Sequence, residues 1–169
     1  MTLIVGNKVI YPSHGPCLIG PVVEKVVADR PVKFYHLAIL DEGGGELYVP
    51  VDKAQTIGLR LLLKKSDIPK LLSQLRQPTG VTKDWKQRAS DNLRLLASGS
   101  AFDLVEVVES LTVLSETKAL SFREKQMLER ARKLLVCEIA EVMEETKSAA
   151  EEQLDEALKA RKIKQQPAL

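Results

Sequence analysis

The strongest constraint on this 169-residue chain is a change in hydrophobic spacing near residue 62. Before that point, short runs of β-branched and apolar residues are separated by glycines and prolines, a pattern typical of short strands joined by turns. After it, apolar residues recur at the three- to four-residue spacing of amphipathic helices. The sequence therefore predicts an α+β chain of two domains, residues 1–62 and residues 63–165.

The N-terminal domain is expected to be a small antiparallel sheet. Its candidate strands are residues 8–11, 17–27, 32–40, 46–49 and 55–60. Gly20 and Pro21 interrupt the second run and predict a bend or bulge there. A triple glycine at 43–45 predicts the turn before the fourth run. About five short strands in so few residues indicate a twisted, barrel-like sheet.

The C-terminal domain has well-marked helix starts. Ser121 and Glu124 have the spacing of a capping box and open the longest helical pattern. The other predicted helix-starting residues are Ser66, Thr82, Ser100 and Ser148. Short connections between about five such helices predict a compact bundle. Residues 166–169 are expected to form a flexible tail.

Charge is unevenly distributed along this helical part. Residues 64–94 carry eight basic and three acidic side chains, and residues 118–133 carry six and two. Residues 138–156 carry eight acidic side chains and one lysine. This banding indicates either a bundle with one positive and one negative end, or solvated helix faces with internal ion pairs. Because the net charge is only +2, a polyanion would have to be recognised by a local patch.

Trp85, the only tryptophan, lies at a predicted helix start among Lys83, Lys86 and Arg88. Two interpretations are open. The indole packs on a neighbouring helix, as tryptophans on average do. Alternatively, it faces outward beside the cations as a wedge against nucleic acid.

Residue types that carry catalysis or bind metals are scarce, and we predict a protein that is not an enzyme. His14 and His36 are the only groups suited to proton transfer at neutral pH. His14 and Cys17 offer at most two metal ligands, whereas a structural zinc needs four. Cys137 lies in an apolar helical run and is expected to be a small buried hydrophobe. We therefore expect a binding protein with no cofactor and no metal.

The chain shows no signal for membranes or secretion. No apolar stretch approaches the roughly 20 residues that span a bilayer, and the N-terminus does not resemble a signal peptide. The two cysteines make no disulfide framework. A cytoplasmic location without a membrane partner is expected.

Several motifs resemble those of the CarD/CdnL family of bacterial transcription regulators. The first is Val5-Gly6-Asn7-Lys8-Val9-Ile10-Tyr11-Pro12-Ser13-His14-Gly15. The others follow in the family's order at residues 49–60, 84–88, 92–99, 105–111 and 120–136. The resemblance extends over residues 4–160, and so many motifs in one order make it specific.

The resemblance implies a function as well as a fold. It implies an N-terminal Tudor-like domain that docks on the β subunit of bacterial RNA polymerase. It also implies a helical domain that contacts promoter DNA near the −10 element, at the upstream edge of the transcription bubble. The protein is then expected to stabilise the open promoter complex without reading sequence, as a monomer associated with the nucleoid through polymerase.

The resemblance also implies site residues. Trp85 matches the family tryptophan that is wedged into the minor groove, and Arg88 and Lys125 match basic positions near the DNA backbone. Gln87 and Ser90 stand where relatives often have basic residues, so other cations are expected to compensate. These compensating cations, chosen from their spacing, are Lys86, Arg123 and Arg132. Lys25 and Tyr48 match positions that contact the polymerase β subunit.

A second function is also compatible with the sequence. The Tudor-like domain of the transcription-repair coupling factor binds polymerase without this DNA contact. The alternative is therefore a protein–protein adaptor that binds polymerase and never touches DNA.

Overall fold

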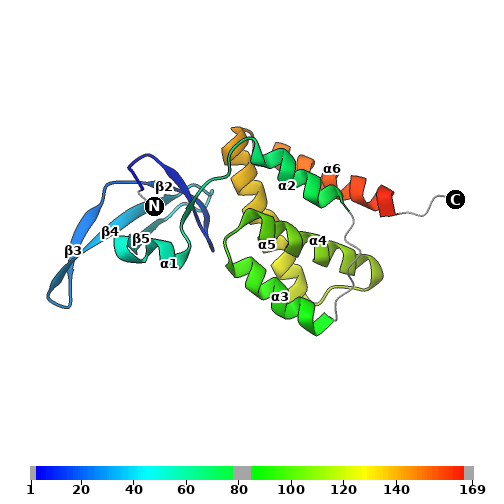
Figure 1. Ribbon diagram of the computed structural model, residues 1–169, viewed down its shortest axis with the longest axis horizontal. Coiled ribbons are helices and arrows are strands. Elements are labelled where there is room, and N and C mark those ends of the chain that lie inside the picture. Colours follow the sequence, from blue (N-terminus) through cyan, green and yellow to red (C-terminus); the bar gives the residue numbers. More distant parts are fainter. Residues whose placement is uncertain (1–2, 78–84, 166–169) are drawn as a thin grey trace. The chain divides into compact units, whose positions relative to one another are not determined.

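The computed structural model describes residues 3–77 and 85–165, except for the side chains of Trp85, Lys86, Arg88 and residues 162–165. The chain divides into two units, Met1–Leu62 and Leu63–Leu169, named below the sheet unit and the helical unit. Strands occupy the first and helices dominate the second (Figure 1), which confirms the predicted α+β layout. The predicted cap Thr82 and the predicted tail 166–169 lie outside the described residues.

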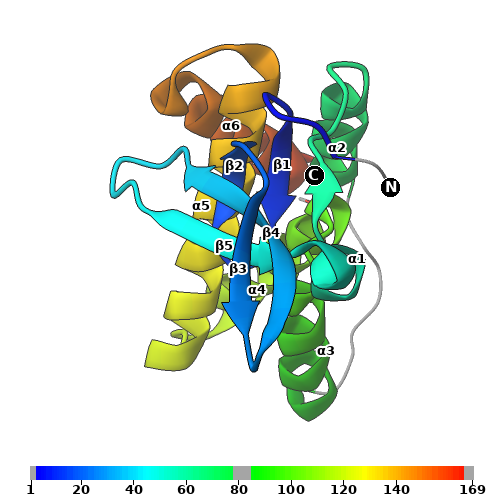
Figure 2. The same ribbon diagram turned by 90° about the vertical axis from the view of Figure 1, so that its left-hand side faces the viewer.

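The described part of the sheet unit forms one six-stranded antiparallel sheet. Its strands are β1 (Lys8–Tyr11), β2 (Gly15–Ile19), β3 (Val23–Val27), β4 (Arg30–Ile39), β5 (Glu46–Pro50) and β6 (Arg60–Leu61). The strand order is β3-β4-β2-β1-β6, and β5 pairs with the other edge of β4. The long β4 is therefore the centre of the sheet, as Figure 2 shows from the side of this unit.

The core of the sheet unit is built from alternate strand residues. Val9, Cys17, Ile19, Leu37 and Val49 are all buried in one cluster. In β4 the buried Tyr35 and Leu37 alternate with less buried neighbours, because successive side chains of a strand point to opposite faces, whereas β2 buries four of its five residues and β3 buries none. The period-two pattern read from the sequence thus determines which residues make the core.

The predicted strand at residues 55–60 is wrong. Val51–Lys53 forms a 3₁₀ turn and Ala54–Ile57 forms the short helix α1, so that extended structure returns only in β6. Gly58 ends α1 in the left-handed region, with φ +96°, and its N–H donates to the carbonyls of Ala54 and Gln55. A glycine is common at this position because it adopts the left-handed conformation without a Cβ clash, and it fixes where the helix ends.

The predicted bend at Gly20 is confirmed, since the chain leaves β2 at Ile19 and enters β3 at Val23. The Gly20 N–H donates to the His36 carbonyl at 2.8 Å. A Cβ on Gly20 would lie only 2.7 Å from Nδ1 of His36. Only glycine permits this close approach between the bend and β4.

The helical unit contains five helices among its described residues, as the sequence predicted. They are α2 (Asp67–Arg76), α3 (Trp85–Ala97), α4 (Ala101–Thr117), α5 (Phe122–Met143) and α6 (Lys147–Gln165). The long α5 packs against α4 and α6, α2 packs on α6 and α4, and α3 packs on α4 (Figure 1). Within the described residues, no helix has both the length and the apolar character needed to cross a bilayer.

Two of the predicted caps are confirmed. The Glu124 N–H donates to Ser121 Oγ at 3.2 Å, and the Ser121 N–H donates to Glu124 Oε1 at 2.9 Å, which completes the capping box. Ser100 Oγ accepts the Asp103 N–H at 3.5 Å and caps α4. These bonds satisfy N–H groups that a helix start leaves without intrahelical partners.

Two other predicted helix starts are wrong in detail. Ser66 precedes α2 but makes no capping bond with its side chain, whereas the carboxylate of Asp67 accepts the Lys64 N–H at 3.0 Å. Helix α6 begins at Lys147, and Thr146 Oγ1 accepts the Ala149 N–H at 3.1 Å. Ser148 therefore lies inside the first turn. Neighbouring oxygen-bearing residues compete for the same N–H groups, and backbone geometry selects among them.

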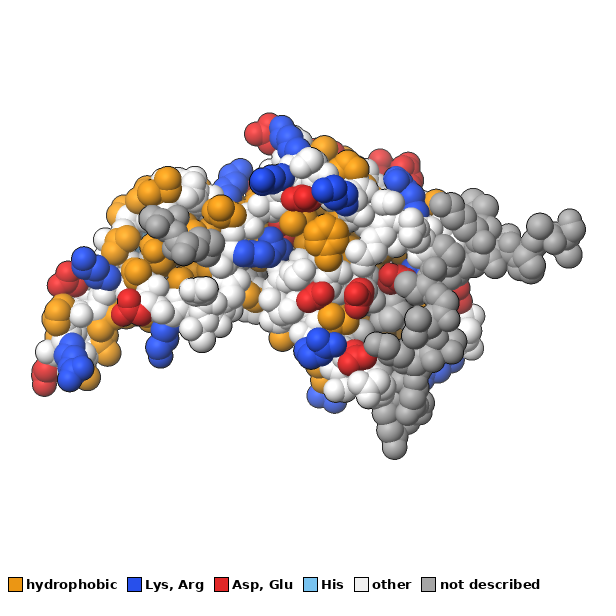
Figure 3. Space-filling view, in the orientation of Figure 1, with side chains coloured by type: hydrophobic (Ala, Val, Ile, Leu, Met, Phe, Trp, Pro, Cys, Tyr) orange, Lys and Arg blue, Asp and Glu red, His pale blue; other side chains and the backbone are white. Residues whose placement is uncertain are grey.

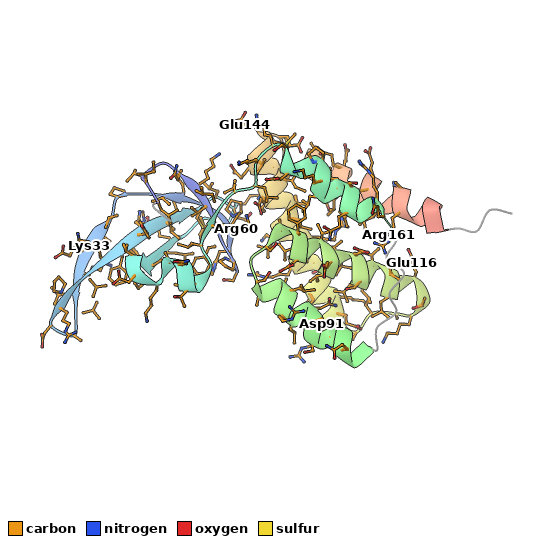
Figure 4. The ribbon with its side chains drawn as sticks, in the orientation of Figure 1. Lys33, Arg60, Asp91, Glu116, Glu144 and Arg161 are labelled. Carbon is orange, nitrogen blue, oxygen red and sulfur yellow. The ribbon has the colours of Figure 1, made fainter. Side chains whose placement is uncertain are left out.

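The core of the helical unit also contains acidic and basic side chains. Arg161 Nη1 of α6 lies 2.7 Å from Glu109 Oε1 of α4, and these side chains are only 3% and 4% exposed. Figure 4 labels Arg161 on α6, beside α4. The buried Glu138 accepts the Leu63 N–H at 3.0 Å. Both carboxylates tie together segments that are far apart in sequence.

Candidate functional site

Helix α3 begins at Trp85, and its second half is anchored on α4. The buried Asn92 accepts a hydrogen bond from Ser110 Oγ at 3.0 Å, and Leu95 is buried. The side chains of Trp85, Lys86 and Arg88 lie outside the described residues, so both interpretations of Trp85 stay predictions. The contacts of Asn92 and Leu95 nevertheless fix the position of α3 against α4.

The start of α5 presents two of the predicted DNA-contacting cations. Arg123 and Lys125 are exposed in the first turn, immediately after the capping box. No ion pair joins either of them to another side chain that the structure describes. The hydrogen bond from the Ser121 N–H holds the pKa of Glu124 below its ordinary value, so this carboxylate stays ionised and occupied by the cap.

A groove with a volume of about 320 Å³ lies between α3, α4 and α5. Its lining is mostly apolar, with Leu93, Leu114 and Met127 among the residues that form it. Arg123 of α5 and Ala89 of α3 also line it. Ala89 follows Trp85 by four positions in the same helix. The structure thus brings the start of α5 to the same groove as the first half of α3.

Sequence reasoning missed Phe122, the first residue of α5. Its side chain is 77% exposed. A phenylalanine normally gains a few kcal/mol from burial, and this one stands beside the exposed cations Arg123 and Lys125, which makes it a candidate contact residue. The available signal was an aromatic residue placed directly after a cap and followed by Arg123 and Lys125.

The structure does not group Arg132 with the other cations. Its guanidinium lies 2.6 Å from Asp155 and 3.6 Å from Glu151, both on α6. The side chain is only 24% exposed. Arg132 therefore links α5 to α6, and its positive charge is paired with Asp155 and Glu151 inside the helical unit.

The two predicted polymerase-contacting residues lie next to each other in the sheet unit. Lys25 on β3 and Tyr48 on β5 flank β4, and the Lys25 Nζ lies 4.1 Å from the centroid of the Tyr48 ring. The His36 ring on β4 lies 5.2 Å from the Tyr48 ring. These three side chains form a row across three neighbouring strands, in which Lys25 and Tyr48 are exposed and His36 is half-buried.

The strand β3 is an edge of the sheet, since β4 is its only partner among the described strands. Val22, Val26 and Val27, beside or within it, are exposed. Figure 3 shows hydrophobic side chains over much of the sheet unit's visible surface. An open strand edge with exposed valines can accept a further strand from a partner protein.

The sparse candidates for metal or catalytic chemistry have structural roles. The His14 Nδ1 shares a hydrogen bond with Ser13 Oγ at 2.9 Å, and its ring packs edge-on against Tyr11. Cys17 is fully buried, and burial raises the pKa of its thiol to about 11. No group of three or more His, Cys, Asp or Glu side chains suited to a metal ion occurs in the described part of the chain. Cys137 is buried, as predicted.

Each of the two units matches a known protein-family model. The model described as the CarD-like/TRCF RID domain matches residues 3–61, and the model described as the CarD C-terminal domain matches residues 70–155. The chain belongs to the CarD/CdnL family. It is therefore a transcription-associated factor of a family that interacts with RNA polymerase, and this family is one of transcription factors, not of known enzymes.

The individual relatives share between 24% and 33% of aligned residues with this chain. The putative transcription factor YdeB of Bacillus subtilis (strain 168) is 24% identical over 136 residues, which are 80% of this chain and 88% of that relative. The solution NMR structure of the 72-residue N-terminal domain of Myxococcus xanthus CarD is 33% identical and has a TM-score of 0.30. That match covers 36% of this chain and 79% of the Myxococcus domain.

Proposed function

We propose that this CarD/CdnL-family protein docks on the β subunit of bacterial RNA polymerase through its sheet unit and stabilises the open promoter complex through its helical unit. The observation that carries the proposal is the pair of family matches, residues 3–61 and 70–155, in one chain. A polymerase-binding domain joined to a second domain raises the local concentration of the second at the promoter.

The polymerase contact is assigned to the exposed row that contains Lys25 and Tyr48. A tyrosine ring beside a lysine offers both apolar area and charge, and tyrosine is frequent where binding energy is concentrated. The open edge of β3 adds backbone N–H and C=O groups that a strand of polymerase can pair with. Both features support docking through this surface.

The DNA contact is assigned to Trp85, Lys86 and Arg88 at the start of α3, and to Arg123 and Lys125 at the start of α5. Cations add affinity for the phosphate backbone without choosing a sequence. An aromatic side chain that stacks where strands separate favours open DNA, but only by its difference in affinity for the two states. Such a contact is worth roughly 1–3 kcal/mol, or about 5- to 150-fold in the open-complex population. Arg132 takes no part, since its charge is paired within the bundle.

Binding to free DNA should be weak. The net charge is +2 and few exposed cations share one surface, so few counterions would be released. Appreciable DNA contact is then expected only when polymerase holds the protein at the promoter. Tight, sequence-specific binding by the isolated chain would contradict the proposal.

The deciding experiment is a promoter-melting time course with polymerase and the full chain. Trp85→Ala should shorten the open-complex lifetime by about fivefold or more and leave polymerase binding unchanged. Tyr48→Ala is the matched control, because it should weaken docking and recover the full lifetime at saturating protein. The Trp85→Ala defect should persist at saturation.

The same experiment distinguishes the adaptor that never touches DNA. Such a protein would bind polymerase, show an unchanged lifetime with Trp85→Ala and give no Trp85-dependent footprint upstream of the −10 element. That combination of results would reject the open-complex mechanism and keep polymerase binding.

A further inference from the structure

The groove between α3, α4 and α5 has a hydrogen-bond donor without a partner at one end. Asn92 lines the groove there, although it is only 4% exposed. Its Oδ1 accepts the hydrogen bond from Ser110 Oγ at 3.0 Å, whereas its Nδ2 has no hydrogen-bond partner among the residues that the structure describes. A buried donor left unpaired is unfavourable, so this amide nitrogen suits an acceptor that comes from outside the chain.

The other end of the groove is cationic. Lys118, which follows α4, and Arg123, in the first turn of α5, both line it and are exposed. No ion pair joins either cation to a side chain in the described part of the chain. Glu124 lines the same end, but its carboxylate is engaged by the Ser121 N–H at 2.9 Å. Two unpaired cations beside a helix start favour the binding of an anion.

Apolar side chains separate the two ends. Ser110 and Lys118 are eight positions apart along α4, which corresponds to roughly 12 Å at the rise of an α-helix. The walls between these positions come from all three helices, and their apolar residues are Leu93, Leu111, Leu114 and Met127. The volume of about 320 Å³ lies at the small end of the roughly 300–1,000 Å³ typical of ligand pockets. The groove therefore suits a small, elongated molecule.

We propose that this groove binds a small, elongated carboxylate with an apolar middle and a second oxygen at its far end. The carboxylate lies against Lys118 and Arg123, and the far oxygen accepts a hydrogen bond from Asn92 Nδ2. The apolar middle covers the leucines and the methionine of the walls. Each part of such a molecule thus meets the complementary chemistry. The site is independent of the proposed function, since neither polymerase nor DNA takes part in it.

A titration of the full chain with ω-hydroxyoctanoate, followed by NMR chemical shifts, tests the site. Octanoate lacks the far oxygen, and the octane diol with a hydroxyl at each end lacks the charge. Each of these two compounds should therefore bind about threefold more weakly, or worse. The shifted signals should belong to the groove residues of α3, α4 and α5. Equal affinity for all three compounds, or no binding of any, would overturn the proposal.

A pair of substitutions on α3 locates the ligand. Ala89 lines the groove, so Ala89→Phe should fill part of it and abolish binding. Ser90→Phe is the matched control, because Ser90 lies outside the groove lining and should leave the affinity unchanged. Both positions are exposed, so neither variant should change the unfolding midpoint. Equal binding by the two variants would place the ligand elsewhere and overturn the proposal.

Substitution of the two cations tests the charged end separately. Lys118→Gln and Arg123→Gln should each weaken ω-hydroxyoctanoate binding by about two- to fivefold and leave the affinity for the diol unchanged. An equal loss for the acid and the diol would refute the contact with the carboxylate. Signals of the groove residues that shift with protein concentration alone would show a second copy in the groove, and would overturn the proposal.

Discussion

Lys25 and Tyr48, which lie on two strands separated by β4, form a cation–π contact with the Lys25 Nζ 4.1 Å from the ring centroid. At an exposed position such a contact is worth about 0.5–1 kcal/mol. The energy is small, but it holds both side chains in one arrangement before a partner arrives. The two residues are therefore expected to act as a unit in binding.

A double-mutant cycle tests this coupling. Lys25→Ala and Tyr48→Ala should each weaken binding to polymerase by about 5- to 30-fold, or roughly 1–2 kcal/mol. The double variant should lose less than the two losses combined, by about 0.5–1 kcal/mol. Lys33→Ala on β4 (Figure 4) is the control, since Lys33 alternates to the face opposite His36 and Tyr48. Binding is measured by interferometry on immobilised polymerase, and strictly additive losses would refute the coupling.

The buried pair of Glu109 and Arg161 predicts a large effect on stability. Arg161→Met leaves the Glu109 carboxylate buried beside an apolar side chain, and we expect a loss of about 3–5 kcal/mol in the free energy of unfolding. The double change Glu109→Leu with Arg161→Met should cost far less, because neither charge of the pair remains without the other. Denaturant unfolding measures both variants. A single change that costs under about 1 kcal/mol would show that water reaches this pair.

The two-residue turn between β3 and β4 predicts a stabilising substitution. Ala28 and Asp29 have φ +51° and +62°, the left-handed conformation that such hairpin turns require. Because Ala28 has a Cβ, this conformation is strained there by about 1–2 kcal/mol, of which glycine recovers part. Ala28→Gly should raise the free energy of unfolding by about 0.5–1 kcal/mol, seen as a higher unfolding midpoint. An unchanged or lower midpoint would show that the turn is not strained.

The capping box predicts a pH dependence at the start of α5. The pKa of Glu124 is lowered from 4.5 in the folded protein, chiefly by the hydrogen bond from the Ser121 N–H. Its contribution to stability is thus fully present above pH 4.5 and is lost as the pH falls through the lower, folded pKa. Glu124→Gln should be less stable at neutral pH and lose less stability on acidification. Glu116→Gln, at an exposed position of α4, is the control, and identical pH profiles for the two variants would contradict the assignment.

Much of the fold was predictable because it depends on local chemistry. The switch from period two to helical spacing identified the two structural classes and most strand positions. The Ser121–Glu124 spacing predicted a cap that the structure contains. The sequence did not predict the helix at Ala54–Ile57. The residues before it favour strands, and Gly58, which ends the helix in the left-handed conformation, adds nothing to the apolar pattern.

The candidate site was predictable only in part. The family resemblance selected Lys25 and Tyr48, and spacing selected Arg123 and Arg132, without saying which of these residues lie together. The structure pairs Lys25 with Tyr48, leaves Arg123 exposed beside Phe122, and ties Arg132 to α6. The charge of a residue is visible in sequence, but its partner is not.

The sequence by itself determined where helices and strands form, because hydrophobic period, caps and turn residues act over a few neighbouring positions. Only the tertiary structure decided which cations stay exposed, which aromatic ring faces solvent and which carboxylates are buried. Those outcomes depend on how elements distant in the chain pack together, and α4, α5 and α6 supply partners that no local pattern encodes.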